Sequence, residues 1–189
     1  MRALARVLVA GATLTIWTAG TGLAQHPQKR QGLWIGAGLG YGSLGRTCDA
    51  CQNFPGEGGP SGYVKVGATP DPRVLMGIEV NGWRHDLQGT TVTSGNASFV
   101  VYAYPALASG FFLKGGLGVS LYREDTTATT GFGLTAGAGY DIRVGENLSL
   151  TPVANFTFGS LGNLTPRAGV FLPGVQQTLL QLALGVTFH

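Results

Sequence analysis

Three residues near the middle of the chain could form a hydrolytic site. His85 and Asp86 are adjacent and follow Trp83 closely, and Ser94 lies further along the same polar segment. A serine, a histidine and an acid can act together in any sequence order, provided that their geometry is right. Such a set on a polar loop is also common by chance. We therefore expect no enzymatic activity and name no catalytic residue, with a lipid-modifying hydrolase kept as the weakest alternative.

A second candidate is the pair Cys48 and Cys51, which forms the motif C-D-A-C. In an exported chain an even number of cysteines indicates a disulfide. The motif supplies only two zinc ligands, and the nearest candidate histidine, His85, lies in another predicted loop. No predicted helix begins at the pair, as a reactive thiol would need. We expect a local disulfide, with a metal site or a redox pair as alternatives, and we expect no metal or other cofactor.

Four charged residues lie on the polar side of alternating segments. Counting from a turn centred near Asp71 places Lys65 diagonal to Glu79, and a connection centred near residue 126 places Lys114 diagonal to Asp141. A buried charge without a partner would cost several kcal/mol. We therefore predict two inward ion pairs, Lys65–Glu79 and Lys114–Asp141. They would either fill the interior of the fold or act as a gate in a pore.

Eight segments must position these groups, and all but the fourth alternate apolar and polar residues with a period of two. This alternation is the pattern of β-strands that have two different faces. The first segment shows it well, because Leu33, Ile35 and Leu39 alternate with Trp34 and glycines. In the fourth segment both faces are apolar, so its phase stays open. The predicted strands are 32–44, 61–69, 74–84, 95–105, 111–122, 131–142, 147–158 and 176–188.

The connections alternate between short and long. The short ones are turns at 69–73, 106–110 and 143–146, and the long ones are loops at 45–60, 85–94, 123–130 and 159–175. This rhythm is typical of outer membrane β-barrels, whose short turns face the periplasm and whose long loops face outside. Strands of ~9–11 residues suffice to cross the bilayer. An even strand number returns both ends of the barrel domain to the same side.

The composition decides which face of the strands points outward. Charged residues make up 11% of the chain and hydrophobic residues 44%, and there are 32 glycines. An ordinary soluble domain has about 25% charged residues. The polar face, made of Gly, Ser and Thr, is a poor water-facing surface but suits the interior of a small barrel. A soluble lipid-carrying barrel, with the apolar face inside, is the alternative. We therefore predict an all-β fold: a closed eight-stranded antiparallel up-and-down transmembrane β-barrel.

Aromatic residues at the strand ends agree with a membrane location. They form two groups, one at the short-turn end and one at the long-loop end, as membrane-interface belts require. The predicted interfacial aromatics are Tyr41, Tyr104, Phe111, Tyr140, Phe156 and Phe188.

The N-terminal segment predicts export. Residues 1–24 combine the basic residues Arg2 and Arg6, an apolar core at 7–17, and small residues before a cleavage point. We therefore predict a signal peptide at 1–24, a periplasmic lead-in at 25–31 and an outer membrane barrel domain at 32–189. Without the signal peptide, 10 basic residues stand against 9 acidic ones, which gives no electrostatic footprint for nucleic acid.

Two stretches carry a resemblance to a known family. The segment GFGLTAGAGYDIRVGENLSLTP at 131–152 and the closing LALGVTFH at 182–189, together with the strand pattern, resemble small outer membrane proteins of the OmpA/OmpX-like barrel superfamily. Two features depart from the family. We expect the chain to stop at the barrel, without the peptidoglycan-binding domain of full-length OmpA-like proteins. Barrels of this family tend to end on a terminal aromatic that the assembly machinery reads, whereas here Phe188 is followed by His189.

The resemblance implies a structural or surface-interaction role in the outer membrane. Because eight strands leave little open channel, we also expect a lumen plugged by side chains. Surface contacts would use the loops 45–60 and 159–175. The implied partners are outer membrane lipids and, during biogenesis, the assembly machinery, and we expect a monomer. A narrow pore or hydrophobic-compound channel is the main alternative function.

Overall fold

The computed structural model describes residues 30–49, 54–87, 90–124, 127–164 and 172–189. The secondary structure of these ranges is made of β-strands, and they contain no helix long and apolar enough to cross a membrane. The strands are β1 (Gly32–Thr47), β2 (Phe54–Asp71), β3 (Val74–Leu87), β4 (Thr90–Ala103), β5 (Phe111–Glu124), β6 (Thr127–Tyr140), β7 (Ile142–Arg143), β8 (Leu148–Leu164) and β9 (Leu172–Phe188).

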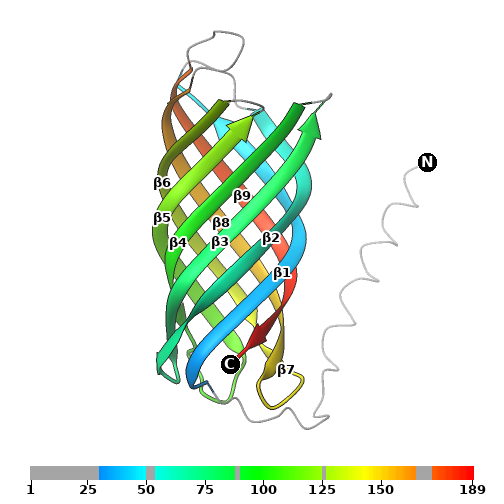
Figure 1. The fold of residues 1–189 in the computed structure, drawn as a ribbon, viewed down its shortest axis with the longest axis vertical. Coiled ribbons are helices and arrows are strands. Elements are labelled where there is room, and N and C mark those ends of the chain that lie inside the picture. The colour runs from blue at the N-terminus through cyan, green and yellow to red at the C-terminus, as the bar shows by residue number, and fades with distance from the viewer. Residues whose placement is uncertain (1–29, 50–53, 88–89, 125–126, 165–171) are drawn as a thin grey trace, which may run out of the picture.

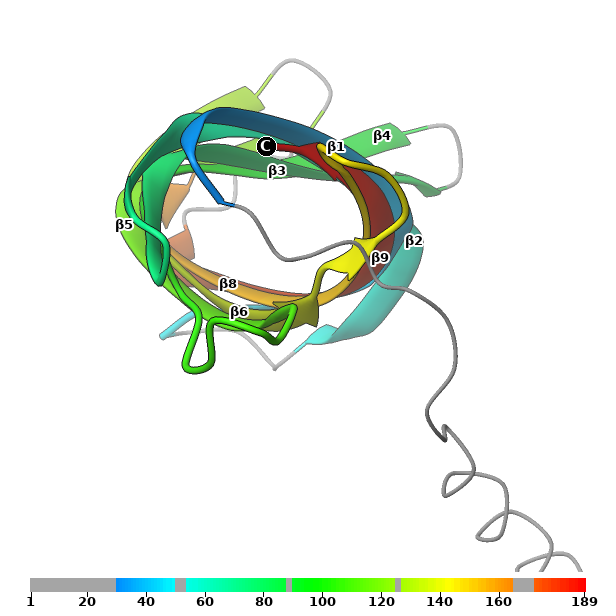
Figure 2. The ribbon, with the colours of Figure 1, turned by 90° about the horizontal axis from the view of Figure 1, so that it is seen from below.

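The strands form one antiparallel sheet that closes on itself. Neighbours along the chain pair with each other from β1 to β6, then β6 pairs with β8, β8 with β9, and β9 with β1. The short β7 follows β6 after Asp141 and pairs with the same neighbour, β8. β6 and β7 therefore act as one interrupted strand. The predicted closed eight-stranded antiparallel barrel is confirmed (Figures 1 and 2).

The two ends of the barrel differ. β1 begins and β9 ends at the same end of the barrel. The three short connections also lie there, and we call this the turn end. We call the opposite end the hairpin end. The predicted long loops there are largely wrong, since most of residues 85–94 and 123–130 belong to paired strands. Strands also extend into 45–60 and 159–175. The sequence did not predict these extensions, because they are rich in polar residues and glycine. Backbone pairing continues there, beyond the apolar part of the wall, without the alternation of apolar and polar residues.

The direction of the side chains agrees with the predicted orientation. Apolar residues of each strand point out of the barrel, and their polar or small neighbours point in. On β1, for example, Leu39 is 79% exposed and Trp34 only 1%. The open phase of the fourth strand is also settled. Val100 and Tyr102 face inward with the polar side chains of β4, and Phe99 faces outward.

Glycines in the wall make room for the large inward rings. Gly67 and Gly77 pair with each other on β2 and β3. A Cβ atom at either position would lie 2.5–2.8 Å from Cζ2 of Trp34. The indole packs against this glycine pair, and its Nε1 donates a hydrogen bond to the carbonyl oxygen of Ala68 at 3.1 Å. Two glycines thus fix the position of the largest aromatic side chain at the turn end.

The predicted domain boundaries reach beyond the described residues. The signal peptide at 1–24 lies entirely outside them. Of the lead-in at 25–31, Arg30 and Gln31 are described. Arg30 is buried, and it donates a hydrogen bond to the carbonyl oxygen of Ser109 at 2.6 Å.

Candidate functional site

The interior of the barrel holds the charged residues, and its centre is Glu79 on β3. Both carboxylate oxygens accept hydrogen bonds from Lys114 Nζ, at 2.5 and 2.6 Å. The amide of Asn81 donates to Oε1 at 2.8 Å, and the hydroxyl of Tyr102 donates to Oε2. All four side chains are buried. The carboxylate therefore has a full set of donors in a space without exposed surface, as a buried charge requires.

This arrangement differs from the predicted partner of Lys114. Lys114 pairs with Glu79, not with Asp141. Glu79 is in register with Ser98 on β4 and, through Ser98, with Gly118 on β5. Barrel strands tilt by ~35–45°, so positions at the same height shift along each successive strand. This shift brings Lys114, four residues before Gly118, level with Glu79. Cross-strand counting within single hairpins could not find such a contact.

Lys65 is opposite Glu79 in register, yet its ammonium group lies among aromatic rings. Nζ is 5.1 Å from the ring centre of Tyr102 and 5.6 Å from that of Phe112. The ring centres of Trp34 and Tyr63 follow at 5.7 and 5.9 Å. Cations at such distances are attracted by the negative faces of the rings. The ammonium also interacts electrostatically with Asp141 and Glu79.

Asp141 forms a second polar centre at the turn end. Its carboxylate accepts hydrogen bonds from the hydroxyls of Tyr104 and Thr151, each at 2.7 Å. His189 Nε2 lies 3.6 Å from Oδ2, and the guanidinium of Arg30 stacks over the Tyr104 ring at 3.7 Å. His189 is the C-terminal residue, and its side chain is buried. These groups cover the interior from the turn end.

Tyr104 also corrects the predicted interfacial aromatics. Its side chain is 2% exposed and points inward to Asp141. β4 has inward-facing even-numbered residues from Val92 onward, and Tyr104 keeps this alternation just past the strand end. The other predicted aromatics point outward, and their place at a membrane interface stays a prediction: Tyr41, Phe111, Tyr140, Phe156 and Phe188.

Uncharged polar side chains fill the middle of the interior. Asn96 donates to the hydroxyls of Thr135 at 2.6 Å and Ser98 at 2.9 Å. Asn155 donates to Gln181 at 2.8 Å. Such amide and hydroxyl groups are costly to bury unless they bond to one another. The pattern of alternating apolar and polar residues predicted their direction but not their partners.

An apolar cluster fills the interior at the hairpin end, and we call it the upper cluster. Its members come from six strands: Leu44, Trp83, Val92, Tyr122, Leu161, Val175 and Leu179. Trp83 Nε1 donates to the carbonyl oxygen of Gly42 at 3.1 Å. Above the cluster, Arg46 donates to the Tyr122 hydroxyl at 2.5 Å and pairs with Glu57 at 3.6 Å. Three of its residues, Val92, Leu161 and Val175, lie in segments predicted as loops, so the sequence pattern did not reveal the cluster.

The three residues considered for a hydrolytic site, His85, Asp86 and Ser94, do not form a catalytic group. Successive residues of a strand point to opposite faces, and His85 and Asp86 are adjacent on β3. The His85 ring stacks on Trp83 at 5.8 Å, while Asp86 accepts a hydrogen bond from Thr91 at 2.6 Å on the exposed side. Ser94 is buried inside. Asp86 therefore does not orient His85 toward Ser94.

Two other predictions concern metals and the cysteines. Among the described residues, no three His, Cys, Asp or Glu side chains group as metal ligands. Cys48 packs against the upper cluster. Cys51 lies outside the described residues, so the Cys48–Cys51 disulfide stays a prediction.

Comparison with known proteins shows which solved structures share this fold. No protein-family model matches the chain, and neither does any curated protein sequence. Among solved structures, Ail, the attachment invasion locus protein of Yersinia pestis, matches with a TM-score of 0.60 and 12% identity, over 84% of this chain and 99% of that one. Neisserial surface protein A (NspA) matches with a TM-score of 0.53 and 15% identity, over 82% and 96%. Ail in complex with the heparin analogue sucrose octasulfate matches with a TM-score of 0.57 and 10% identity, over 84% and 99%. The chain thus has the fold of the small outer membrane β-barrels, as its resemblance to the OmpA/OmpX-like superfamily predicts.

Proposed function

We propose that this protein is exported to the outer membrane and acts there as an integral barrel with a structural or surface-contact role. The observation that carries this proposal is the outer wall. Large apolar side chains are exposed on all eight strands, among them Leu39, Val64, Phe99 and Leu182. Contiguous apolar surface of this extent is unfavourable in water and marks contact with lipid. Closure of the sheet pairs the backbone groups, which a lipid environment requires.

The filling of the interior supports a plugged lumen. The upper cluster lies at the hairpin end, the amide network around Asn96 and Asn155 in the middle, and the Glu79 and Asp141 centres toward the turn end. An eight-stranded barrel has just enough interior for side chains to fill. Three successive layers of bonded or packed side chains argue against a wide aqueous path.

A surface-contact role would belong to the segments around the hairpin end, including 45–60 and 159–175. Two of the matching solved structures are, by name, an attachment invasion locus protein and a surface protein. One was solved with a sulfated sugar. Here Arg46 is already paired with Glu57 and Glu124. The described part of this end has mixed charge, so we do not assign a polyanion such as heparin as its ligand.

Membrane fractionation and gel mobility test the location. The barrel should be found in the outer membrane fraction and should migrate differently before and after boiling in detergent. Recovery in the soluble fraction, or no change of mobility, would refute the proposal.

Planar bilayers test the plug against the pore alternative. The native protein should give no large steady current. Trp83→Ala with Leu179→Ala, which removes the bulk of the upper cluster, should raise conductance if that cluster closes the barrel. Large steady currents from the native protein would instead support a narrow pore. For the hydrolase alternative, acyl-chain release that is lost in His85→Ala would be required.

A further inference from the structure

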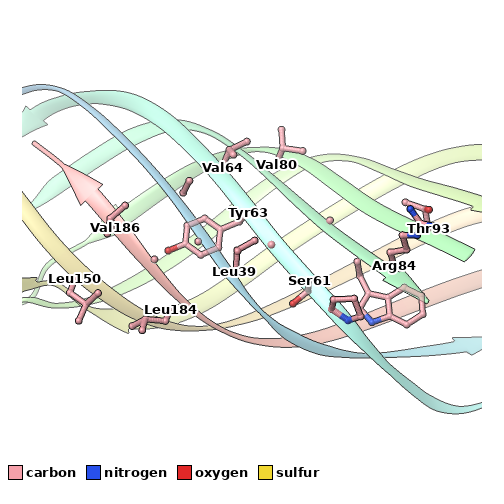
Figure 3. Close-up of a pocket in the computed structure, with 17 residues that line it drawn as sticks. Leu39, Ser61, Tyr63, Val64, Val80, Arg84, Thr93, Leu150, Leu184 and Val186 are labelled. Carbon is pink, nitrogen blue, oxygen red and sulfur yellow. The ribbon is translucent and has the colours of Figure 1, made fainter. Parts of the chain in front are cut away.

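A groove on the outer wall carries an inference about a specific lipid. Its volume is about 910 Å³, within the range of ~300–1,000 Å³ that ligand sites usually have. Figure 3 shows the groove running across β9, β1, β2 and β3, with Val186 and Val64 along it and Arg84 and Thr93 at one end. The groove is therefore apolar over its length and cationic at one end.

Outward-facing glycines make the groove. Gly62, Gly82 and Gly95 pair side by side across β2, β3 and β4. Leu39 on β1 and Leu121 on β5 continue the same row and border it. A Cβ atom at Gly82 would have no heavy atom within 4 Å, so the wall is open outward at this point. The row is a depression with Val64 and Val80 on its turn-end side and the polar side chains of Arg84 and Thr93 on its hairpin-end side.

A second depression of about 480 Å³ continues the groove toward the turn end, between Ile35, Val66 and Ile78. From Arg84 to Ile78 along β3 the track covers six residues, or ~20 Å at ~3.4 Å per residue. With strands tilted by ~35–45°, it descends ~15 Å, which is half of the hydrocarbon core. A track of this depth fits acyl chains of one leaflet.

Two arginines stand where the headgroup of such a lipid would lie. Arg84, Thr93 and Arg123 pair side by side on β3, β4 and β5, and all three side chains are exposed on the outer wall. The two arginines are two strands apart, or ~10 Å. Arginine binds phosphate through two parallel hydrogen bonds. The rim thus offers two phosphate sites with a hydroxyl between them.

The neighbouring acids do not neutralise this rim. Asp86 lies 3.4 Å from Arg84, but both side chains are 63% exposed, and exposed ion pairs contribute little. Glu124, next to Arg123, points the other way and accepts a hydrogen bond from Tyr122 at 2.8 Å. A phosphate group can therefore compete for both guanidinium groups.

We propose that this groove binds a lipid with two phosphates on its headgroup and several acyl chains, which is the chemistry of lipid A in the outer leaflet. The proposal rests on the membrane location proposed above, with the hairpin end outside. The phosphates contact Arg84 and Arg123, and the acyl chains cross the glycine row and follow the groove toward Ile78.

The test uses the full protein, extracted from membranes in mild detergent and given bis-phosphorylated lipid A in mixed micelles. Native mass spectrometry then measures the lipid retained per barrel. We expect one retained lipid A, and about tenfold less retention when Arg84→Gln and Arg123→Gln remove the phosphate contacts. Gly82→Leu, which fills the groove, should also lower retention.

Two matched variants control for charge and bulk. Arg73→Gln removes an exposed arginine at the opposite end, and Gly115→Leu adds a leucine at an outward glycine of β5 that also has open space. Both should retain lipid A as the native barrel does.

Equal retention by all variants, or equal retention of phosphatidylglycerol, would overturn the proposal. So would a dimer that forms through the glycine row without lipid A. A barrel with heat-modifiable mobility that fails to retain lipid A refutes this site alone, whereas loss of that mobility in the native protein refutes the membrane barrel itself.

Discussion

Lys114 Nζ lies 2.5 Å from Oε1 of Glu79, across the intervening strand β4, with both side chains buried. This ion pair joins β3 and β5 through the interior, where no backbone pairing links them. The hydroxyl of Tyr102, on the strand between them, completes the contact. The pair therefore acts as a cross-brace of the barrel, and its strength can be measured.

Glu79→Gln should destabilise the barrel by about 3–5 kcal/mol, because it leaves the Lys114 ammonium buried without a carboxylate. Urea-driven unfolding in lipid vesicles measures the change. The double variant Glu79→Gln with Lys114→Met removes both charges and should recover most of the loss. If Glu79→Gln unfolds at the same urea concentration as the native protein, the cross-brace contributes nothing to stability.

Tyr104→Phe tests the inward placement of this side chain. The variant loses the hydrogen bond to Asp141, which should lower the free energy of unfolding by about 1.5–3 kcal/mol. Tyr140→Phe is the matched control, because Tyr140 lies on the outward face of β6, and its effect should stay within about 0.5 kcal/mol. Equal effects of the two variants would contradict the assignment of Tyr104 to the interior.

Gly77→Val should destabilise the barrel through steric overlap. A Cβ atom there would lie 2.2 Å from the carbonyl oxygen of Val66 and 2.8 Å from the Trp34 ring. Overpacking of this kind costs about 1–3 kcal/mol. Gly115→Val, at an open outward position of β5, should leave stability near the native value. The indole fluorescence should also change in Gly77→Val, and an unaltered spectrum with native stability would mean that the ring does not pack on this glycine.

The predicted Cys48–Cys51 disulfide can be tested by mass analysis. The native protein should resist alkylation of both thiols, and reductant should make two alkylation sites available. Two thiols that react without reductant would show that the bridge does not form.

The sequence by itself determined the architecture and the orientation of the wall. Alternation with a period of two fixes which side chains share a face, and a shortage of charged residues leaves lipid as the only partner for the apolar face. The outward direction of Leu39 and the inward direction of Trp34 follow from this pattern and composition alone. These are local properties that each strand but the fourth carries in its own sequence; both faces of the fourth are apolar, so the structure decided its phase.

The tertiary structure decided which residues meet inside. Lys114 reaches Glu79 and Tyr104 reaches Asp141 because tilted strands shift level positions along each successive strand, which a count within one hairpin does not include. The tertiary structure also decided that polar segments at the hairpin end, such as 85–94, continue the strands, since backbone pairing extends beyond the apolar part of the wall. The row of Gly62, Gly82 and Gly95 exists only through the register of three strands. Contacts of this kind depend on the tilt and closure of the whole barrel, which no single segment encodes.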